Sequence, residues 1–226
     1  MPVAEADRLF AGLVDEFGVR PTARLELLQG RARLALMLGD VARAESLLDL
    51  ADELAADIGR RQRWRARDIR ARLLAQMGRN EEARSAFAGL AESWEREGYT
   101  AYGALARAHL AIVAVRLGDV VAAGRTAAAA LDVARSVGDY ESTVMAGVAM
   151  SAVQLAAGEI DEAVSLARTA VDVASAGDWV VLVADARLAF ARALAAAGQP
   201  DQAGEQTSLA ERLYAGKGHA VGAGRR

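Results

Sequence analysis

The chain of 226 residues contains no cysteine, only three prolines and a single lysine, Lys217, and aromatic residues amount to 5%. The lack of cysteine excludes disulfides, thiol catalysis and Cys-ligated zinc. Because proline is the strongest helix breaker, its scarcity favours long helices. A net charge of −3 provides no general basic field for nucleic acid. Hydrophobic residues make up 53%, mostly alanine, leucine and valine, which predicts a soluble chain of closely packed helices.

Targeting signals are not visible at the start of the chain. Residues 1–7 lack the basic start and apolar run of a secretion signal. The longest uncharged stretch, residues 142–158, approaches membrane-spanning length but contains serine, threonine, glutamine and glycine. We therefore expect a cytoplasmic protein without a membrane span. The predominance of arginine over lysine is typical of a bacterial genome rich in G and C.

A glycine followed by a polar residue recurs at spacings of 39, 40, 40 and 40 residues. These glycines are Gly39, Gly78, Gly118, Gly158 and Gly198. An alanine stands five residues after each of them, and a small residue stands seven residues before each. A second series follows about 20 residues later, at Gly59, Gly98, Gly138, Gly177 and Gly218. Glycine is usual just past a helix C-terminus, so each period predicts two helices joined as a hairpin, with small residues where the helices cross.

This repeat predicts one N-terminal helix, residues 3–17, followed by five helical hairpins. The hairpins are residues 22–58, 61–97, 100–137, 140–176 and 179–215, in a single domain of residues 1–216 with a flexible tail of residues 217–226. The N-terminal helix matches the second helix of a hairpin, because residues 10–13 (Phe-Ala-Gly-Leu) recur as residues 87–90. We expect that this helix either caps the array or follows a first helix in a longer chain.

The combination of a small residue, a turn glycine, and alanines five and twelve residues later resembles the tetratricopeptide repeat (TPR) over about residues 22–216. The unit of 40 residues is longer than the family's usual unit of roughly 34. In this respect the chain is similar to the helical-repeat regions of bacterial ATPase-type transcription regulators. The resemblance implies an all-α fold, a right-handed α-solenoid (TPR-like superhelix), in which the first helix of each hairpin lines a concave face.

Carrying the family's concave-face pattern over to this sequence implies a partner-binding face. Its residues are Arg33, Arg65, Arg72, Leu105, Ile112, Val115, Arg116, Met145, Val148, Leu155 and Arg192. The middle of this set is apolar and arginines flank it, which suits a protein or peptide with apolar anchors and acidic flanks. The apolar strip is either an open groove for such a partner or buried by the superhelix itself. An apolar small molecule is the other ligand that would fit.

Residues that could support catalysis do not converge. His109 and His219 lie far apart in the repeat array, which argues against a shared metal site. The glycines around Lys217 lack the strand and the following Ser or Thr of a phosphate-binding loop. We therefore predict no enzyme, no catalytic residue, no cofactor and no metal.

Seven arginines crowd residues 60–72, together with Trp64. They could bind phosphates or an acidic peptide, because arginine pairs with oxyanions in a bidentate fork. Acidic residues that include Asp49 and Asp52 precede the cluster, so its arginines could instead pair within the fold. We favour pairing within the fold, and the acidic total argues against nucleic acid.

These patterns predict an interaction module that binds a protein or peptide on its concave face. The alternative is a ligand-sensing or regulatory region of a larger signalling or transcription-regulator protein. A neighbouring ATPase or DNA-binding domain would favour that alternative, whereas a free-standing chain would favour the module. The sequence leaves a homo-oligomer open.

Overall fold

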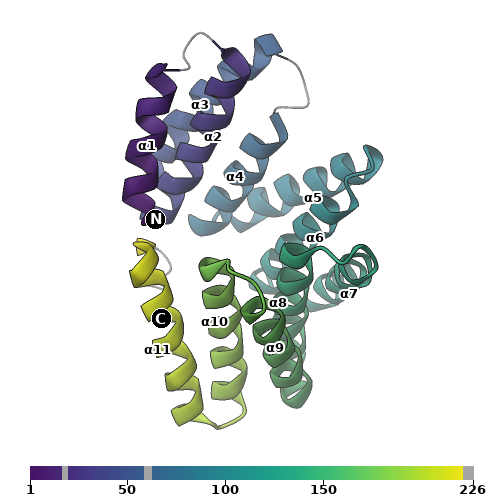
Figure 1. Cartoon of the computed structure of the whole chain (residues 1–226). Helices are drawn as coiled ribbons and strands as arrows, with labels where there is room; N and C mark the ends of the chain where they lie inside the picture. Colours follow the sequence, from purple (N-terminus) through teal and green to yellow (C-terminus); the bar gives the residue numbers. More distant parts are fainter. Residues whose placement is uncertain (17–19, 59–62, 221–226) are drawn as a thin grey trace. The chain divides into compact units, whose positions relative to one another are not determined.

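The structure is a computed structural model that describes residues 1–16, 20–58 and 63–220. Within these ranges its regular structure consists of α-helices (Figure 1). They are α1 (Val3–Glu16), α2 (Pro21–Leu38), α3 (Val41–Ile58), α4 (Arg63–Gln76), α5 (Asn80–Arg96), α6 (Thr100–Arg116), α7 (Val120–Val137), α8 (Tyr140–Ala157), α9 (Ile160–Ser175), α10 (Val180–Ala196) and α11 (Pro200–Lys217). The all-α fold with one N-terminal helix and five hairpins is thus confirmed. Of the predicted tail, residue 217 ends α11, and residues 221–226 lie outside the described ranges.

The glycine–aspartate pairs of the repeat end one helix and begin the next. Gly39 has a left-handed backbone (φ 77°), and its N–H and that of Asp40 donate to the last carbonyls of α2. The Asp40 carboxylate then accepts from the N–H of Arg43 at 3.2 Å, in the first turn of α3. Asp119 caps α7 in the same way, through the N–H of Ala122 at 3.1 Å. Each such pair therefore satisfies backbone groups at two helix ends at once.

Gly177 is an exception among the predicted helix-ending glycines, because its φ is not positive. A Cβ on Gly177 would lie 2.5 Å from Cζ of Tyr140, so this position needs glycine for close approach. The Tyr140 hydroxyl donates to the backbone carbonyl of Ala174 at 2.6 Å and joins the start of α8 to the end of α9. Burial, and then the charge of Asp178, raise the pKa of Tyr140.

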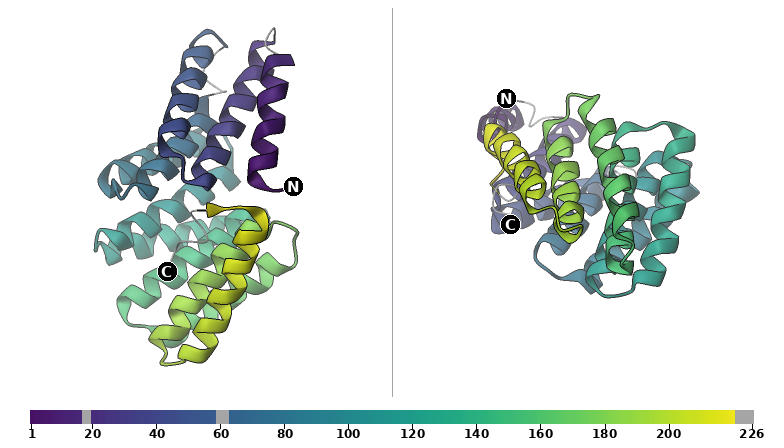
Figure 2. Two further views of the ribbon diagram at one scale, coloured as in Figure 1. Left: turned by 90° about the vertical axis from the view of Figure 1, so that its left-hand side faces the viewer. Right: turned by 90° about the horizontal axis from the view of Figure 1, so that it is seen from below.

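Contacts between helices divide the chain into two compact units. Unit 1 comprises residues 1–78 and 214–226, and unit 2 comprises residues 79–213. In unit 1, α2 packs against α1 and α3, and α4 packs against α2 and α3. In unit 2, each helix from α5 to α9 packs against the next one along the chain, and paired helices lie side by side (Figure 2). The single domain of residues 1–216 stays a prediction, and each unit is described by itself.

Alanines form much of the core of unit 2, where helices cross at short range. Ala123, Ala127, Ala130 and Ala134 of α7 are all fully buried. At the crossing of α8 and α9, the buried Ser151 hydroxyl donates to the Ala163 carbonyl at 2.8 Å. A larger side chain at such a crossing would push the two helix axes apart. The small residues of the repeat are therefore packing residues, as their spacing predicts.

Helix α1 packs on α2 as a second helix packs on the next first helix. The Phe10 ring lies against Gly30 of α2, where an added Cβ would be 2.5 Å from Cε2 of the ring. Two repeat units further on in register, the Phe87 ring of α5 stacks on His109 of α6, with 5.2 Å between ring centroids. Gly30 and His109 each lie two residues before the small residue of their helix. The packing therefore supports the assignment of α1 as a second helix.

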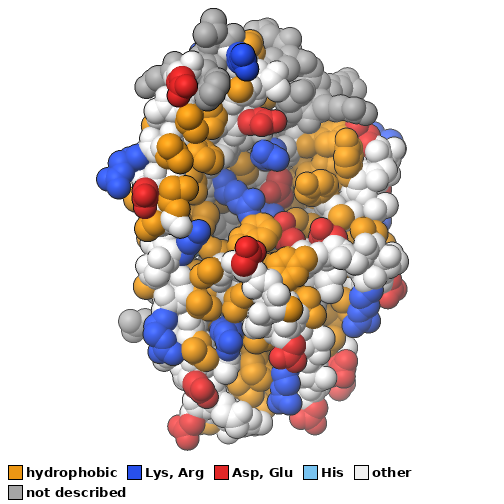
Figure 3. Space-filling view, in the orientation of Figure 1, with side chains coloured by type: hydrophobic (Ala, Val, Ile, Leu, Met, Phe, Trp, Pro, Cys, Tyr) orange, Lys and Arg blue, Asp and Glu red, His pale blue; other side chains and the backbone are white. Residues whose placement is uncertain are grey.

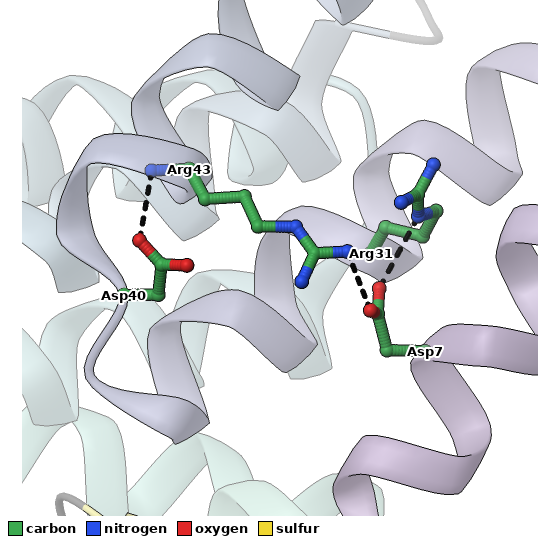
Figure 4. A network of polar contacts seen from close by, with 4 residues as sticks. All are labelled: Asp7, Arg31, Asp40 and Arg43. Carbon is green, nitrogen blue, oxygen red and sulfur yellow. Dashed lines mark hydrogen bonds and ion pairs between the residues drawn. The ribbon is translucent and has the colours of Figure 1, made fainter.

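A buried carboxylate also ties α1 to the first hairpin. The side chain of Asp7 is 8% exposed and pairs with Arg31 of α2 at 3.2 Å and with Arg43 of α3 (Figure 4). Asp40 completes the group through the backbone of Arg43. Three helices of unit 1 thus meet at one ion-pair network.

Candidate partner-binding face of the first helices

The first helices of unit 2 lie next to one another, because α8 packs against both α6 and α10. Repeat-equivalent residues, 40 apart in sequence, therefore form rows across three helices. One row is Ile112, Ala152 and Arg192, and a second row begins with Val115 and Leu155. These rows contain four of the predicted partner-binding residues. The other four of this unit, Leu105, Arg116, Met145 and Val148, lie on the same helices α6 and α8.

Burial divides the predicted apolar strip into two parts. Leu105, Met145 and Val148 are less than 10% exposed and belong to the core of unit 2. Ile112, Val115 and Leu155 are half-buried and pack against that core. The second group keeps accessible apolar surface, whereas the first group acts mainly through packing.

Two cationic side chains border the half-buried group. Arg116 is exposed in the last turn of α6, and Arg192 is exposed in the last third of α10. Aliphatic side chains beside a guanidinium present both an apolar and an anion-binding group to a ligand.

Unit 1 carries the other predicted arginines, on α2 and α4. Arg33 and Arg65 are exposed, whereas Arg72 is half-buried and donates through Nε to Asp68 at 2.9 Å. The pair of Arg72 with Asp68 on the same helix lowers the charge that Arg72 offers to a ligand. Of the three predicted arginines in unit 1, Arg33 and Arg65 are thus the exposed ones.

The arginine cluster of residues 60–72 is partly paired within the fold. Arg70 bonds Asp49 and Asp52 of α3, both at 2.9 Å. Burial lowers the pKa of Arg70, but the hydrogen bonds to both carboxylates and the attraction of their charges together outweigh burial, so the net pKa is raised. For Arg70 and Arg72 the pairing interpretation therefore holds, while Arg65 and Arg67 are exposed. Residues 60–62 lie outside the described ranges.

Sequence reasoning missed an aromatic cluster at the turn between α5 and α6. The Tyr102 ring lies 5.5 Å from that of Trp94 and 6.3 Å from that of Tyr99. Trp94 is buried, but Tyr99 and Tyr102 are among the exposed large apolar residues. Beside them, Arg107 pairs with Glu95 at 2.7 Å. The spacing of Tyr99 and Tyr102 on either side of a helix start was the available signal.

The histidines pack on aromatic rings. His109 stacks on Phe87, and the His219 ring lies 5.2 Å from that of Tyr214. Across the described ranges, no three His, Asp or Glu side chains come together as metal ligands would. Within the same residues, no helix combines the length and the apolarity that a membrane crossing requires.

The fold is shared with solved TPR proteins, although no protein-family model and no curated protein sequence matches the chain. The Rap conjugation gene regulator of plasmid pLS20, in complex with the Phr* peptide, has a TM-score of 0.71 and 11% identity, covering 89% of this chain and 56% of the regulator. BtubC from P. vanneervenii has a TM-score of 0.61 and 16% identity, covering 95% and 89%. A Pyrococcus horikoshii signal transduction ATPase with a tetratricopeptide repeat sensor has a TM-score of 0.60 and 14% identity, covering 86% and 32%. The TPR-like fold is confirmed by these similarities, which at such identities concern the fold alone.

Proposed function

We propose that this chain binds a protein or peptide on the faces of its first helices. In unit 2, apolar anchors of the partner cover Ile112, Val115 and Leu155, and acidic groups pair with Arg116 and Arg192. In unit 1, Arg33 and Arg65 attract acidic groups, with Arg72 in a lesser role. The observation that carries the proposal is the row of half-buried aliphatic side chains bordered by exposed guanidinium groups on adjacent helices.

The energetics of this surface suit a reversible complex. Covering a half-exposed aliphatic side chain contributes about 1 kcal/mol, so three such contacts alone give weak binding. Charge-assisted hydrogen bonds to arginine add about 1.5–3 kcal/mol each where the pair is shielded from water. Together these terms correspond to a dissociation constant in the micromolar range. The peptide complex of a Rap regulator with the same fold supports a peptide as one form of the partner.

A site-specific photo-crosslinker tests the location of the face. We would place it at Leu155 on the first-helix face and, as a matched control, at Val121, which is exposed on the second helix α7. In cells that naturally make the protein, we expect crosslinked peptides from position 155 and none from position 121. Equal labelling from both positions would contradict the proposal.

Charge reversal tests the chemistry of the partner. Arg192→Glu should lower the yield of the position-155 crosslink at least tenfold, while Arg125→Glu, on the exposed side of α7, should leave it unchanged. Peptides recovered from the crosslink should combine aliphatic residues with nearby Asp or Glu. A basic partner insensitive to Arg192→Glu would exclude the acidic-flank model.

The second candidate function is the sensing region of a larger regulator. The shared fold with the TPR sensor of a signal transduction ATPase favours it, since this chain covers 32% of that protein. In that case the ligand on the same face would shift an attached output domain between states. Binding of the crosslinked peptide to the isolated chain and to any longer gene product, with a change of activity only in the latter, distinguishes the two functions.

A further inference from the structure

The aromatic cluster at the α5–α6 turn includes two exposed rings. Tyr99 is 39% exposed and Tyr102 is 53% exposed, and apolar side chains reach the surface in this region, at the upper right of Figure 3. The planes of the two rings are inclined by 62°, so the rings form a corner and not a parallel stack. The buried Trp94 ring packs against Tyr102 and supports it from the protein side. These three residues are here called the tyrosine corner.

Two carboxylates lie at the end of α5, beside the tyrosine corner. Glu97 is exposed in the turn between α5 and α6. Glu95 accepts from Arg107 through Oε2, whereas its Oε1 is buried and has no hydrogen-bond partner within the described residues. This oxygen lies close to Gly103 of α6, where an added Cβ would be 3.3 Å from it. Since Gly103 directly follows Tyr102, an acceptor that lacks a donor lies next to the exposed rings.

We propose that the tyrosine corner binds the arginine side chain of a partner protein. The guanidinium stacks on the exposed Tyr102 ring, and its N–H groups donate to the carboxylates of Glu95 and Glu97. The Glu95 side chain is 32% exposed, so a small rotation brings Oε1 to a donor that arrives from solvent. Arginine fits better than lysine, because its guanidinium is planar, stacks on aromatic rings and carries its N–H donors in a fixed fork.

The charges around the tyrosine corner favour one stacked cation over a long basic segment. Arg96 is exposed in the last turn of α5, and Arg107 pairs with Glu95, so these two arginines balance the formal charges of Glu95 and Glu97. The general attraction for basic chains is therefore small, and geometry decides which cation binds. Phosphates and anionic lipids are a poorer match, because the buried group that lacks a partner is an acceptor.

This inference does not rest on the function proposed above. Tyr102 and Ile112 are ten residues apart on α6, which corresponds to about 15 Å of helix between the tyrosine corner and the half-buried aliphatic group. Arg192→Glu, which tests that function, should leave arginine binding at the tyrosine corner unchanged. The two proposals can therefore fail separately.

The test titrates the full chain with a capped peptide, acetyl-Gly-Gly-Arg-Gly-Gly-amide, and follows the backbone amides of Tyr102 and Gly103 by NMR. We expect saturable shift changes with a dissociation constant on the order of 1 mM. Two matched peptides replace the arginine by lysine or by citrulline, which keeps the shape of arginine without its charge. The lysine peptide should bind at least threefold more weakly and the citrulline peptide at least tenfold more weakly. Free arginine should bind no more tightly than the arginine peptide.

Variants of the chain separate stacking from charge. Tyr102→Leu should weaken binding of the arginine peptide at least fivefold, whereas Tyr102→Phe keeps the ring and should change it less than twofold. Glu95→Gln should weaken binding at least threefold, and Glu92→Gln, at an exposed carboxylate three residues earlier on α5, should leave it unchanged. Circular dichroism should show all four variants as helical as the parent chain, because each altered side chain is at least partly exposed.

Several results would overturn the proposal. They are the absence of saturable shifts up to about 20 mM peptide, equal binding of the citrulline peptide, and unchanged binding by Tyr102→Leu or Glu95→Gln. Equal binding of the lysine and arginine peptides that disappears at high salt would show general attraction to an acidic surface, and would also exclude a stacked guanidinium. Tighter binding of free arginine than of the peptide would assign the tyrosine corner to a small molecule instead of a partner protein.

Discussion

Single residues explain why α1 holds its place in unit 1. Asp7 is a charged residue within the apolar part of a helix, an arrangement that is expensive unless the charge is paired. Arg31 and Arg43 reach it from two other helices, and both keep partial access to water. The network is therefore directional: it stabilises α1 in the register in which Asp7 faces both arginines, as Figure 4 shows.

Substitution of Asp7 measures the contribution of this network. Asp7→Asn should lower the free energy of unfolding by about 2 kcal/mol, because removing one partner of a buried pair leaves the others poorly compensated. Asp49→Asn is the matched control: Asp49 is 66% exposed and Arg70 retains Asp52, so about 0.5 kcal/mol or less is expected. Urea denaturation followed by circular dichroism compares the two. Equal losses in the free energy of unfolding would show that the Asp7 network stabilises the fold no more than an exposed ion pair does.

Substitution of glycine by alanine should have opposite effects on stability at Gly177 and at Gly89. Gly177→Ala would place a Cβ against the Tyr140 ring and displace the hydroxyl from the Ala174 carbonyl, which should cost about 1–2 kcal/mol. Gly89 is inside α5, is exposed, and has open space around a would-be Cβ. Gly89→Ala should therefore stabilise the protein by about 0.5–1 kcal/mol. Thermal unfolding measures both, and a stabilising Gly177→Ala would refute the close-approach explanation.

At the scale of helices, the sequence predicts where each helix ends much better than which of its side chains are exposed. Turn glycines with a polar residue beyond them mark helix ends directly, because the local backbone requires them. Whether an apolar side chain on a first helix is core or surface depends on neighbouring helices, which the sequence does not place. Leu105 and Ile112 follow the same helical spacing, yet only Ile112 keeps accessible area. The sequence analysis missed the ion pair between Asp7 and Arg43 for the same reason, since 36 residues separate them.

The helix crossing itself can be tested at two equivalent positions. Ala111 of α6 is fully buried where Ser151 stands in α8. Ser151→Ala adopts the residue found at the other four positions and should change stability by less than about 1 kcal/mol, because the Ala163 carbonyl keeps its helical hydrogen bond. Ala111→Trp should cost about 3 kcal/mol or more by forcing α6 from α7. An unchanged melting temperature for Ala111→Trp would refute the assigned repeat register.

At the scale of the whole molecule, the two units differ in how each obtains its stability. The larger core cluster of unit 2 runs from Ala104 to Ala203 and draws on α6 to α11, so every member lies within that unit. The core of unit 1 runs from Leu25 to Leu73 and draws on α2, α3 and α4. In repeat proteins each element contacts its sequence neighbours, so stability grows with the number of packed helices.

This difference predicts the behaviour of the separate parts. A fragment of residues 79–217, which keeps α11 whole, should be helical and unfold cooperatively, because it retains the complete larger cluster. A fragment of residues 1–78 should unfold at a lower urea concentration, since a chain of that length buries a smaller share of its surface, roughly 60%. Circular dichroism against urea gives both transitions, and binding of a hydrophobic dye reports loose packing. Strong dye binding by fragment 79–217, together with a gradual loss of helix, would mean that its alanine-rich core requires unit 1 to pack, and the division into two self-sufficient units would then be wrong.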